Sequence, residues 1–504
     1  MNLDPTWIPM KWPGGPLEIA TRLKTQTLRA ELKEALAAWI EPPALELLKG
    51  TPVNCLIVDW ADGEPQAVEQ QRALRPLIEA GRRLGISFVG QVTSRQDPEA
   101  AIAAGLQAGL AGVLLENPPA RPNSAPVILR SPRPKVPWDS AFPILSVTEN
   151  LWPGLGLETM KEKDVAIAGP TGIPWVNSNG WFCLLAHRLG KARALWLEFD
   201  PPTSSNLSHP ANYPLAIADS LAYGSRWVIS LDDSLKTGMI GKNPQAMRLW
   251  ERMASVLSFF RAHEEWGGFQ PQGMLAVISD FRGEHEFLSW EVLNLLSRRH
   301  VQYRIVERSG SLGRAFEGLN AILWVDGEAP AAELQSELLA FVRRGGLLIT
   351  PSYWGPPEAK SIPGGVLDRY AVYDFGKGRI AVPKEGFQDP YEVAVDSHLL
   401  LSRRNDFVRL YNAPPAGCYC SADPRRKKAL VQILDYSSPG PVESVSVWVR
   451  TSNRAGRLWN LGAKESVPIQ GIPLVGGVEF HLPTFAAYAA LEFENGNPRA
   501  GNAR

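Results

Sequence analysis

Short apolar runs alternate with longer amphipathic segments along roughly the first half of the chain. The run NCLIVDW (54–60) precedes AVEQQRALRPLIEAGRRLG, and ISFVGQV (86–92) precedes PEAAIAAGLQAG. Runs that are apolar throughout predict strands buried on both faces, and the segments between them have the period of helices. This alternation predicts a parallel sheet that is covered by helices.

The same pattern continues to about Trp266 with further strand and helix segments, which are PILSVTEN (143–150), ALWLEF (194–199), YPLAIADSLAYG (213–224), RWVISLDD (226–233) and a helix over 244–263. The number of units and their combined length favour a closed (β/α)8 TIM barrel over residues 1–266, with a first strand over 6–12. No phosphate-binding glycine motif follows any strand, so the commonest ligand of an open sheet is missing.

The order of the middle strands of this barrel is left open by the pattern. VILRS (127–131) and ILSVT (144–148) are either successive barrel strands without a helix between them, or one strand and an excursion. The stretch from Gly169 to Pro202 predicts strand, helix and strand, and we assign IPWV (173–176) and ALWLEF to the sixth and seventh barrel strands.

The pattern then changes twice. From Gly273 to about 355, strands and helices alternate in a smaller unit, which predicts an open, flavodoxin-like α/β domain over 267–385, including a Gly- and Pro-rich linker over 354–386. Short alternating runs without any helix then predict an antiparallel β-sandwich over 386–495. The polar end, 496–504, predicts a disordered tail.

Composition narrows the classes of function. The formal net charge is +0, which argues against nucleic acid as a partner, and no apolar run is long enough to span a membrane. The N-terminal residues do not read as a signal peptide, so we expect a cytoplasmic protein, or a periplasmic or secreted one if a signal has been removed. Four cysteines do not form a disulfide framework, and the C-x-C of Cys418 and Cys420 has no further ligands nearby. We therefore expect no metal and no cofactor.

Tryptophan and acidic residues gather in the barrel segment. Of the 17 tryptophans, 12 precede Gly267, and the flat apolar face of Trp stacks on sugar rings, although core packing will account for many of them. Seven carboxylates stand at or just after predicted strand ends, namely Asp59, Glu116, Glu149, Glu198, Asp200, Asp232 and Asp233. Every strand of a barrel ends on the same face, so these groups are expected around one rim.

Hydrolysis of a glycoside needs two carboxyl groups that flank the scissile bond. Glu198 and Asp200 are two apart on one strand and therefore share a face. Glu149 stands beside Asn150 and Trp152, a combination suited to a sugar ring. We rank Glu198 and Glu149 above Glu116 and Asp200 as catalytic candidates. For any one of them, a helix cap or a partner for a nearby arginine is the alternative role.

The remaining candidates are residues that could line the sugar subsites. They are polar or aromatic side chains near the predicted rim: Asp59, Trp60, Trp152, Trp175, Asn177, Asn179, Trp181 and Asp232. Asp232 and Asp233 are adjacent and point to opposite sides, so only one of them can face the pocket.

The order of the three predicted domains resembles that of the trimeric beta-galactosidases among the barrel-fold glycoside hydrolases. The middle domain resembles class I glutamine amidotransferases in outline, with RRGG before a strand, but it contains no cysteine for a nucleophile, which favours a structural or assembly role. The resemblance implies an acid/base Glu at the end of the fourth strand and a nucleophilic Glu at the end of the seventh. Counting strands places Glu116 and Glu198 there, with Leu115 where the family usually has Asn.

These observations predict a glycosidase that acts on an oligosaccharide or glycoside. A catalytically silent protein that binds carbohydrate or serves in assembly is the first alternative, and a lyase or isomerase on the same barrel is the second. The resemblance also implies a homo-oligomer, either a dimer or a trimer.

Overall fold

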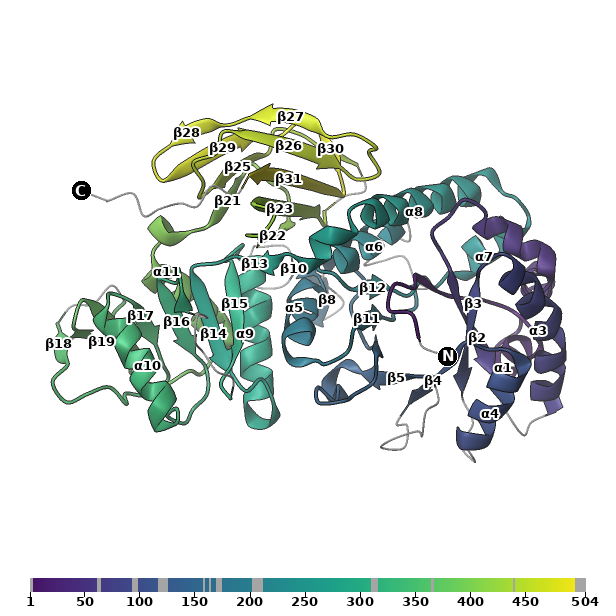
Figure 1. Ribbon diagram of the computed structural model, residues 1–504, viewed down its shortest axis with the longest axis horizontal. Helices are drawn as coiled ribbons and strands as arrows, with labels where there is room; N and C mark the ends of the chain where they lie inside the picture. The colour runs from purple at the N-terminus through teal and green to yellow at the C-terminus, as the bar shows by residue number, and fades with distance from the viewer. Residues whose placement is uncertain are drawn as a thin grey trace. The chain divides into compact units, whose positions relative to one another are not determined.

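The computed structural model describes most of the chain, and the parts that it describes are residues 3–60, 65–92, 98–116, 126–156, 159–162, 165–168, 175–201, 212–309, 316–363, 367–437 and 440–494. Contacts divide the chain into two compact units (Figure 1). The first comprises Met1–Asn179 and Leu189–Gly267, and the second comprises Gly180–Arg188 and Gly268–Arg504. The predicted tail over 496–504 lies outside the described residues, and the three-domain division remains a prediction.

The first unit is built on a parallel sheet of eight strands that is nearly closed into a barrel. Around the ring the strands are β1 (Pro9–Lys11), β2 (Cys55–Trp60), β3 (Ser87–Val92), β4 (Gly112–Glu116), β5 (Val127–Pro132), β6 (Ile144–Thr148), β11 (Ala194–Leu197) and β12 (Arg226–Trp227). A parallel bridge between Met10 and Ile229 connects the two ends of the sheet. The predicted barrel is confirmed.

The fifth and sixth strands correct the predicted strand order. β5 and β6 pair in parallel as neighbours and are connected through the short 3-10 helix η2 (Arg133–Lys135), so VILRS and ILSVT are successive barrel strands. The stretch assigned to the sixth strand is not in the barrel. Its residues Trp175–Asn177 form β10, which pairs antiparallel with β7 (Gly154–Gly156). A three-residue strand paired on one side in this way belongs to an excursion between β6 and β11.

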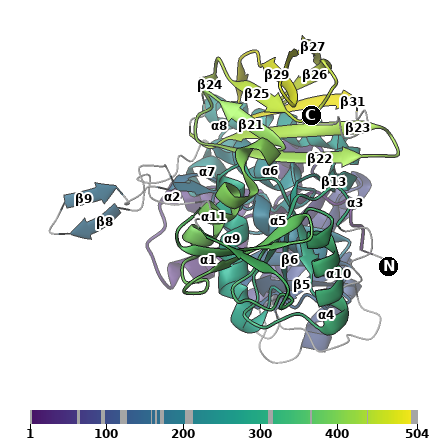
Figure 2. The ribbon, with the colours of Figure 1, turned by 90° about the vertical axis from the view of Figure 1, so that its left-hand side faces the viewer.

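A second antiparallel pair lies in the same excursion. Figure 2 shows β8 (Thr159–Glu162) and β9 (Val165–Ala168) as a hairpin of their own. The helix that follows, α5 (Gly180–Leu189), groups with the second unit rather than with the barrel. There, Trp181 and Phe182 contact the ring of Trp290, with centroids 5.9 Å and 6.1 Å away.

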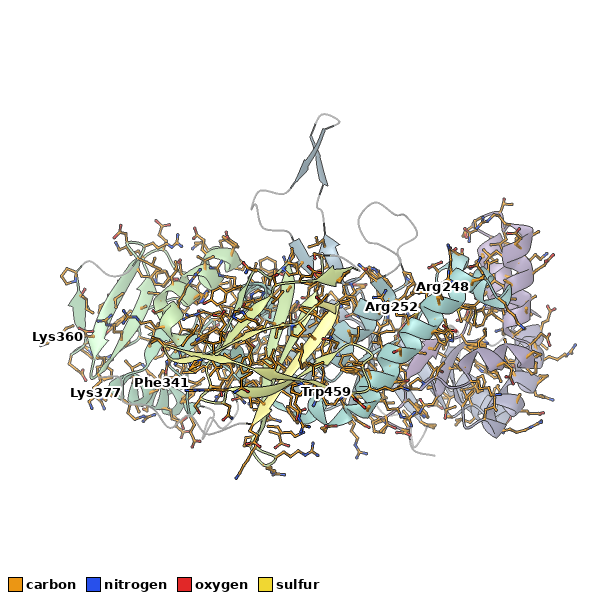
Figure 3. All side chains as sticks on the ribbon, turned by 90° about the horizontal axis from the view of Figure 1, so that it is seen from above. Arg248, Arg252, Phe341, Lys360, Lys377 and Trp459 are labelled. Carbon is orange, nitrogen blue, oxygen red and sulfur yellow. The ribbon has the colours of Figure 1, made fainter. Side chains whose placement is uncertain are left out.

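Most helices of the first unit bury one face and expose the other, and the helix over Tyr213–Leu221 is buried at every residue but the last. They are α1 (Pro16–Leu23), α2 (Ala30–Trp39), η1 (Pro42–Leu48), α3 (Pro65–Arg83), α4 (Pro98–Ala108), α6 (Tyr213–Leu221), α7 (Asp233–Ile240) and α8 (Pro244–Ala262). In α8, Trp250 and Phe260 are buried, whereas Arg248 and Arg252 are exposed one turn apart (Figure 3). Within the described residues, no helix is both long and apolar enough to cross a membrane.

The interior of the barrel is filled by apolar side chains from alternate positions of the strands. They form one buried cluster, which consists of Leu3, Trp7, Cys55, Ile57, Val89, Leu114, Ile128, Ile144, Ala194, Trp196 and Val228. Because side chains alternate across a strand, the next inward position after each of these residues lies two residues further on. The barrel is therefore a packed core, and its chemistry is confined to the strand ends.

The second unit begins with a mixed seven-stranded sheet in the order β15, β14, β16, β17, β20, β19, β18. Its strands are β14 (Leu275–Ser279), β15 (Tyr303–Glu307), β16 (Ala321–Trp324), β17 (Leu347–Ile349), β18 (Lys360–Ile362), β19 (Tyr370–Phe375) and β20 (Gly378–Pro383), with helices α9 (Glu286–Arg298) and α10 (Ala332–Arg343). The predicted linker over 354–386 thus contributes three strands. The alternation of apolar and polar residues in these three strands is short, and the glycines and prolines of the segment obscure it.

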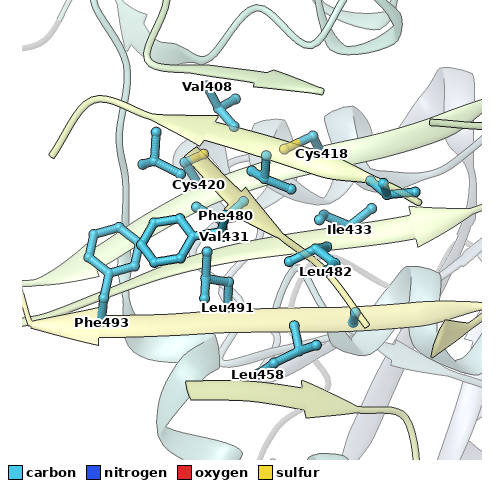
Figure 4. Close-up of a cluster of buried hydrophobic side chains, with 14 of the residues drawn as sticks. Val408, Cys418, Cys420, Val431, Ile433, Leu458, Phe480, Leu482, Leu491 and Phe493 are labelled. Carbon is cyan, nitrogen blue, oxygen red and sulfur yellow. The ribbon is translucent and has the colours of Figure 1, made fainter. Parts of the chain in front are cut away.

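The remaining strands form antiparallel sheets. One six-stranded sheet contains β13 (Gln270–Pro271), β22 (Ala416–Asp423), β23 (Lys428–Asp435), β31 (Tyr488–Glu494), β26 (Ala455–Asn460) and β27 (Val467–Gln470). A four-stranded sheet contains β21 (Val408–Tyr411), β25 (Ser446–Val449), β29 (Gly477–His481) and β28 (Ile472–Leu474), and β24 (Pro441–Val442) pairs with β30 (Phe485–Ala486). Apolar side chains including Val431, Phe480 and Leu491 form a core cluster (Figure 4).

The prediction that residues 386–495 contain no helix is wrong. Helix α11 (Pro390–Leu401) begins this region and contacts α9. Its start has the usual signals, because Asp389 caps the helix by accepting a hydrogen bond from the Tyr391 amide, and Pro390 occupies the first turn. Cys418 and Cys420 are buried in the core cluster of the antiparallel sheets.

Candidate active site at the barrel mouth

One polar side chain from each barrel strand lies at the carboxyl end of the ring. Seven of these residues follow an apolar residue of the interior cluster by two positions and therefore point the same way. We call the following eight side chains the mouth residues: Lys11, Asp59, Gln91, Glu116, Arg130, Ser146, Glu198 and Ser230. The change from an apolar interior to a polar mouth identifies this end of the barrel as the candidate site.

Arg130 links the carboxylates of the fourth and seventh strands. Its Nε and Nη2 donate to Glu198, with a distance of 3.0 Å from Nη2 to Oε2, and its Nη1 donates to Glu116. The Arg130 side chain is 19% exposed and that of Glu198 10%, whereas that of Glu116 is 58% exposed. Burial lowers the pKa of Arg130, but Glu198 and Glu116 outweigh it and raise the pKa above the usual value.

Both carboxylate oxygens of Glu198 and its backbone carbonyl accept hydrogen bonds. Oε1 accepts a hydrogen bond of 2.5 Å from the Ser146 hydroxyl and one from Arg130 Nε, while Oε2 accepts from Arg130 as well. Asn150 Nδ2 donates to the backbone carbonyl of Glu198 at 3.1 Å. A carboxylate that accepts through both oxygens is oriented as an acceptor or nucleophile and not as a proton donor.

Asp200 lies on the same side of the chain as Glu198 but in a more open position. Its Oδ1 accepts from the Ser230 hydroxyl at 2.8 Å and lies 3.7 Å from Lys11 Nζ. Burial raises its pKa, but the Lys11 charge and the Ser230 hydrogen bond together lower it below the ordinary value. Asp200 therefore favours the ionised form.

Asp59 differs from Asp200 because burial outweighs the nearby charges and raises the pKa of its carboxyl above the ordinary value. The charges of Lys11, Lys236 and Arg130 act in the opposite direction, and Glu18 adds to the rise. In the part of the chain that the structure describes, no hydrogen bond or ion pair involves the Asp59 carboxyl. It is thus the mouth acid whose surroundings favour a proton.

Trp60 and Trp152 do not reach the mouth. Trp60 is 1% exposed and points to the opposite side of β2 from Asp59, so that it lies against Gly90 and Gly105 outside the barrel. Trp152 is 4% exposed and contacts the rings of Tyr213 and Trp227. Both tryptophans are packed as core residues.

Asn179 and Asp232 have roles within the fold. Asn179 is fully buried. Its side-chain oxygen accepts from the Leu151 amide, and its side-chain nitrogen donates to the Leu151 carbonyl and to the Asp219 carboxylate. Asp232 caps α7 through the Leu235 amide and accepts from the Tyr213 hydroxyl at 2.9 Å. These contacts occupy the polar atoms that a sugar would need.

The other predicted site residues are not brought to Arg130. Glu149 is exposed just beyond β6, with a backbone φ of 59°, and no ion pair in the described chain joins it to Arg130. Trp181 packs within the second unit, and Asn177 lies in β10. The side chain of Trp175 is outside the described residues. The structure therefore brings together Glu116, Glu198, Asp200 and Asp59.

Five mouth residues were missed by the sequence reasoning, namely Lys11, Gln91, Arg130, Ser146 and Ser230. Arg130 and Ser146 follow the interior residues Ile128 and Ile144 by two positions, as Glu116 follows Leu114. This spacing could have identified them. No arginine or lysine was considered as a site residue, so the cation that the carboxylates share was passed over.

A second polar cluster lies in the other unit, at the carboxyl ends of β14 and β16. Asp280, His285 and Asp326 bring one potential metal-ligand atom each to within 4.8 Å of one another. Arg308 already donates to both acids, at 2.9 Å each, and His285 contacts Asp280 at 3.0 Å. The partners of these acids thus come from the protein itself.

Comparisons with known proteins match the fold and not the sequence. A scan against models of protein families found no match, and a search of curated proteins found none either. Among solved structures, alpha-L-fucosidase isoenzyme 2 from Paenibacillus thiaminolyticus matches with a TM-score of 0.50 and 11% identity, over 89% of this chain and 95% of that one.

Two further solved structures match at lower scores. The exo-beta-1,4-mannosidase from Opitutaceae bacterium strain TAV5 has a TM-score of 0.43 and 12% identity, over 78% of this chain and 93% of that one. A beta-galactosidase from Rahnella sp. R3 has a TM-score of 0.40 and 10% identity, over 85% of this chain and 66% of that one. At these identities a likeness concerns the fold alone. The chain therefore shares its overall fold with the fucosidase from Paenibacillus thiaminolyticus.

Proposed function

We propose that the chain is a glycoside hydrolase that acts at the barrel mouth, with Glu198 as nucleophile or water activator. The observation that carries this proposal is the meeting of Glu116 and Glu198, from the fourth and seventh strands, on the guanidinium of Arg130. Two carboxyl groups from different strands at one mouth are the arrangement that glycoside hydrolysis requires. A further mouth carboxyl supplies the proton for the leaving group.

Turnover of synthetic glycosides tests this proposal. The purified chain would be assayed on a panel of 4-nitrophenyl glycosides that begins with the α-L-fucoside, because the fold matches a fucosidase. We expect Glu198→Gln to lower kcat by at least about 100-fold on any substrate that is cleaved. Glu31→Gln, at an exposed position of α2, is the matched control and should retain full turnover. Equal rates for both variants would contradict the proposal.

A catalytically silent sugar-binding protein is the second candidate, and one observation favours it. Arg130 bonds to both glutamates, as the arginine of a structural ion pair would. Calorimetric titration with the same glycosides separates the two candidates. Heat of binding without release of 4-nitrophenol would support the silent protein. Homo-oligomerisation and an assembly role for the 267–385 segment remain predictions from the resemblance.

A further inference from the structure

The mouth contains more acids than the two that Arg130 holds, and they differ in their partners. Glu198 accepts hydrogen bonds through both oxygens, and Asp200 is paired with Lys11 and Ser230. Glu116 accepts from Arg130 and has a largely exposed side chain. A proton donor needs a carboxyl that is kept neutral, which burial in a site of low polarity achieves. Each of these three carboxyl groups has a cationic partner.

Asp59 is partly buried, and the pKa of its carboxyl is raised above the ordinary value. It points inward at the end of β2, on the same face as the buried interior residues Cys55 and Ile57. Within the described residues its carboxyl has no hydrogen bond or ion pair. The charged groups that act on it are Lys11, Lys236, Arg130 and Glu18, and burial is the largest influence. Its raised pKa agrees with this geometry.

The position of Asp59 relative to Glu198 suits a pair that acts on one bond. Around the ring, β12 and β1 separate β11 from β2, so the two carboxyl groups lie on different sides of the mouth. Both side chains follow a residue of the interior cluster by two positions, so both point into the mouth. A sugar ring between them would have one carboxyl on each side.

We propose that Asp59 is the general acid of this site and donates its proton to the glycosidic oxygen of the substrate. This inference rests on the proposed function and replaces Glu116 in the role that the resemblance implied. The bond between the anomeric carbon and the leaving oxygen breaks, and that oxygen takes the Asp59 proton. In a retaining reaction Glu198 bonds to the anomeric carbon as the leaving oxygen departs, and water then displaces Glu198 and gives its proton to the Asp59 carboxylate. In an inverting reaction water attacks the anomeric carbon directly and gives its proton to Glu198.

Leaving-group dependence tests this assignment. For the sugar that the panel identifies, kcat/KM would be measured for the 2,4-dinitrophenyl glycoside, which needs no protonation, and for the methyl glycoside, which does. We expect Asp59→Asn to lower the rate on the methyl glycoside by about 10²- to 10⁴-fold and to spare the dinitrophenyl glycoside. Asp139→Asn, at an exposed position, is the control. A selective loss in Glu116→Gln instead, with equal losses on both substrates in Asp59→Asn, would overturn the assignment.

A spectroscopic readout keeps this inference separate from the proposed function. Infrared difference spectra of the wild type and Asp59→Asn, recorded over a series of pH values, would show whether Asp59 keeps its proton to a higher pH than an ordinary aspartic acid, as its raised pKa requires. We expect a carbonyl band of a protonated carboxyl that is lost in the variant. Absence of that band overturns the inference even if the chain is an active glycosidase. Presence of the band in a chain that cleaves no glycoside means that the proposed function, and with it the catalytic role of Asp59, has failed.

Discussion

The chain places a cluster of acids at the carboxyl ends of parallel strands twice, once in each unit, and the two clusters differ in what remains unpaired. In the sheet of the second unit, Asp280 and Asp326 both bond to Arg308, and Asp326 also accepts from the Ser279 hydroxyl at 2.5 Å. At the barrel mouth, Arg130 likewise joins two acids, but within the described residues the Asp59 carboxyl has no hydrogen bond or ion pair.

This comparison separates a structural network from a reactive one. A buried polar network that satisfies its own members stabilises a fold and offers little to a ligand. A network that leaves a buried acid unpaired costs stability, and such costs concentrate at functional sites. Strand-end acids and one arginine occur in both units, but we expect a structural role for them in the second unit and a reactive role at the barrel mouth.

The largest expected effect is that of removing the arginine at the mouth. Arg130→Met leaves Glu198 buried and without its charge partner, which should reduce the free energy of unfolding by about 3–5 kcal/mol. Urea denaturation measures this loss. The double variant Arg130→Met/Glu198→Met is the control, since it removes both charges and should recover much of the stability. A loss below about 1 kcal/mol in the single variant would contradict a buried ion pair at this place.

The same change in the second unit should have a smaller effect. Arg308→Met removes a side chain that is 35% exposed, and Asp326 retains its bonds to Ser279 and to the Asp280 amide. We expect a loss of about 1–3 kcal/mol in the same urea experiment. If Arg308→Met proves more damaging than Arg130→Met, the distinction drawn between the two clusters is wrong.

Asp59→Asn should change stability in a direction that depends on pH. The pKa of this acid is raised in the folded state, so its favourable contribution is full below the unfolded value of 3.8 and is lost as the pH rises through the folded pKa. The variant lacks this loss. Its thermal midpoint should match the wild type near pH 3 and exceed it at pH 8. A variant that is less stable than the wild type at pH 8 would show that ionised Asp59 is stabilised by partners.

The smallest expected effect is that of metal on the cluster of the second unit. Asp280, His285 and Asp326 have ligand spacing, but Arg308 and the neighbouring groups already bond to their atoms. We expect added Zn²⁺ to leave the thermal midpoint unchanged, as measured by scanning calorimetry with and without a chelator. A rise that the chelator reverses, and that Asp326→Asn abolishes, would identify a metal site.

Much of the barrel could be predicted from sequence because burial on both faces leaves a simple signal. Leu114 and Trp196 are followed two positions later by Glu116 and Glu198, and counting strands was sufficient to assign both to the mouth. The parity argument was not applied to Asp59 and Trp60, although adjacent strand residues point to opposite faces. Applied there, it would have placed Trp60 among the helices.

Other features were beyond reach because they depend on contacts between distant residues. The aromatic contacts of Trp152 and the hydrogen bonds of Asn179 join segments that no local pattern relates. The three strands within 354–386 are short, and glycine and proline mask their alternation. By contrast, the sequence of α11 contains recognisable helix-start signals, the capping residue Asp389 and a proline in the first turn. The helix was missed because the segments that follow it all have the pattern of strands.

The missing helix between β5 and β6 has a consequence for the order in which the site assembles. β4, β5 and β6 fall within residues 112–148, so pairing them closes only short loops, whereas β11 must return from residue 194. Short loops cost less entropy to close and their contacts form sooner. We therefore expect Glu116, Arg130 and Ser146 to be positioned relative to one another before β11 pairs and brings Glu198 to them. Glu198, the proposed nucleophile, would then be the last of these four side chains to reach its place as the chain folds.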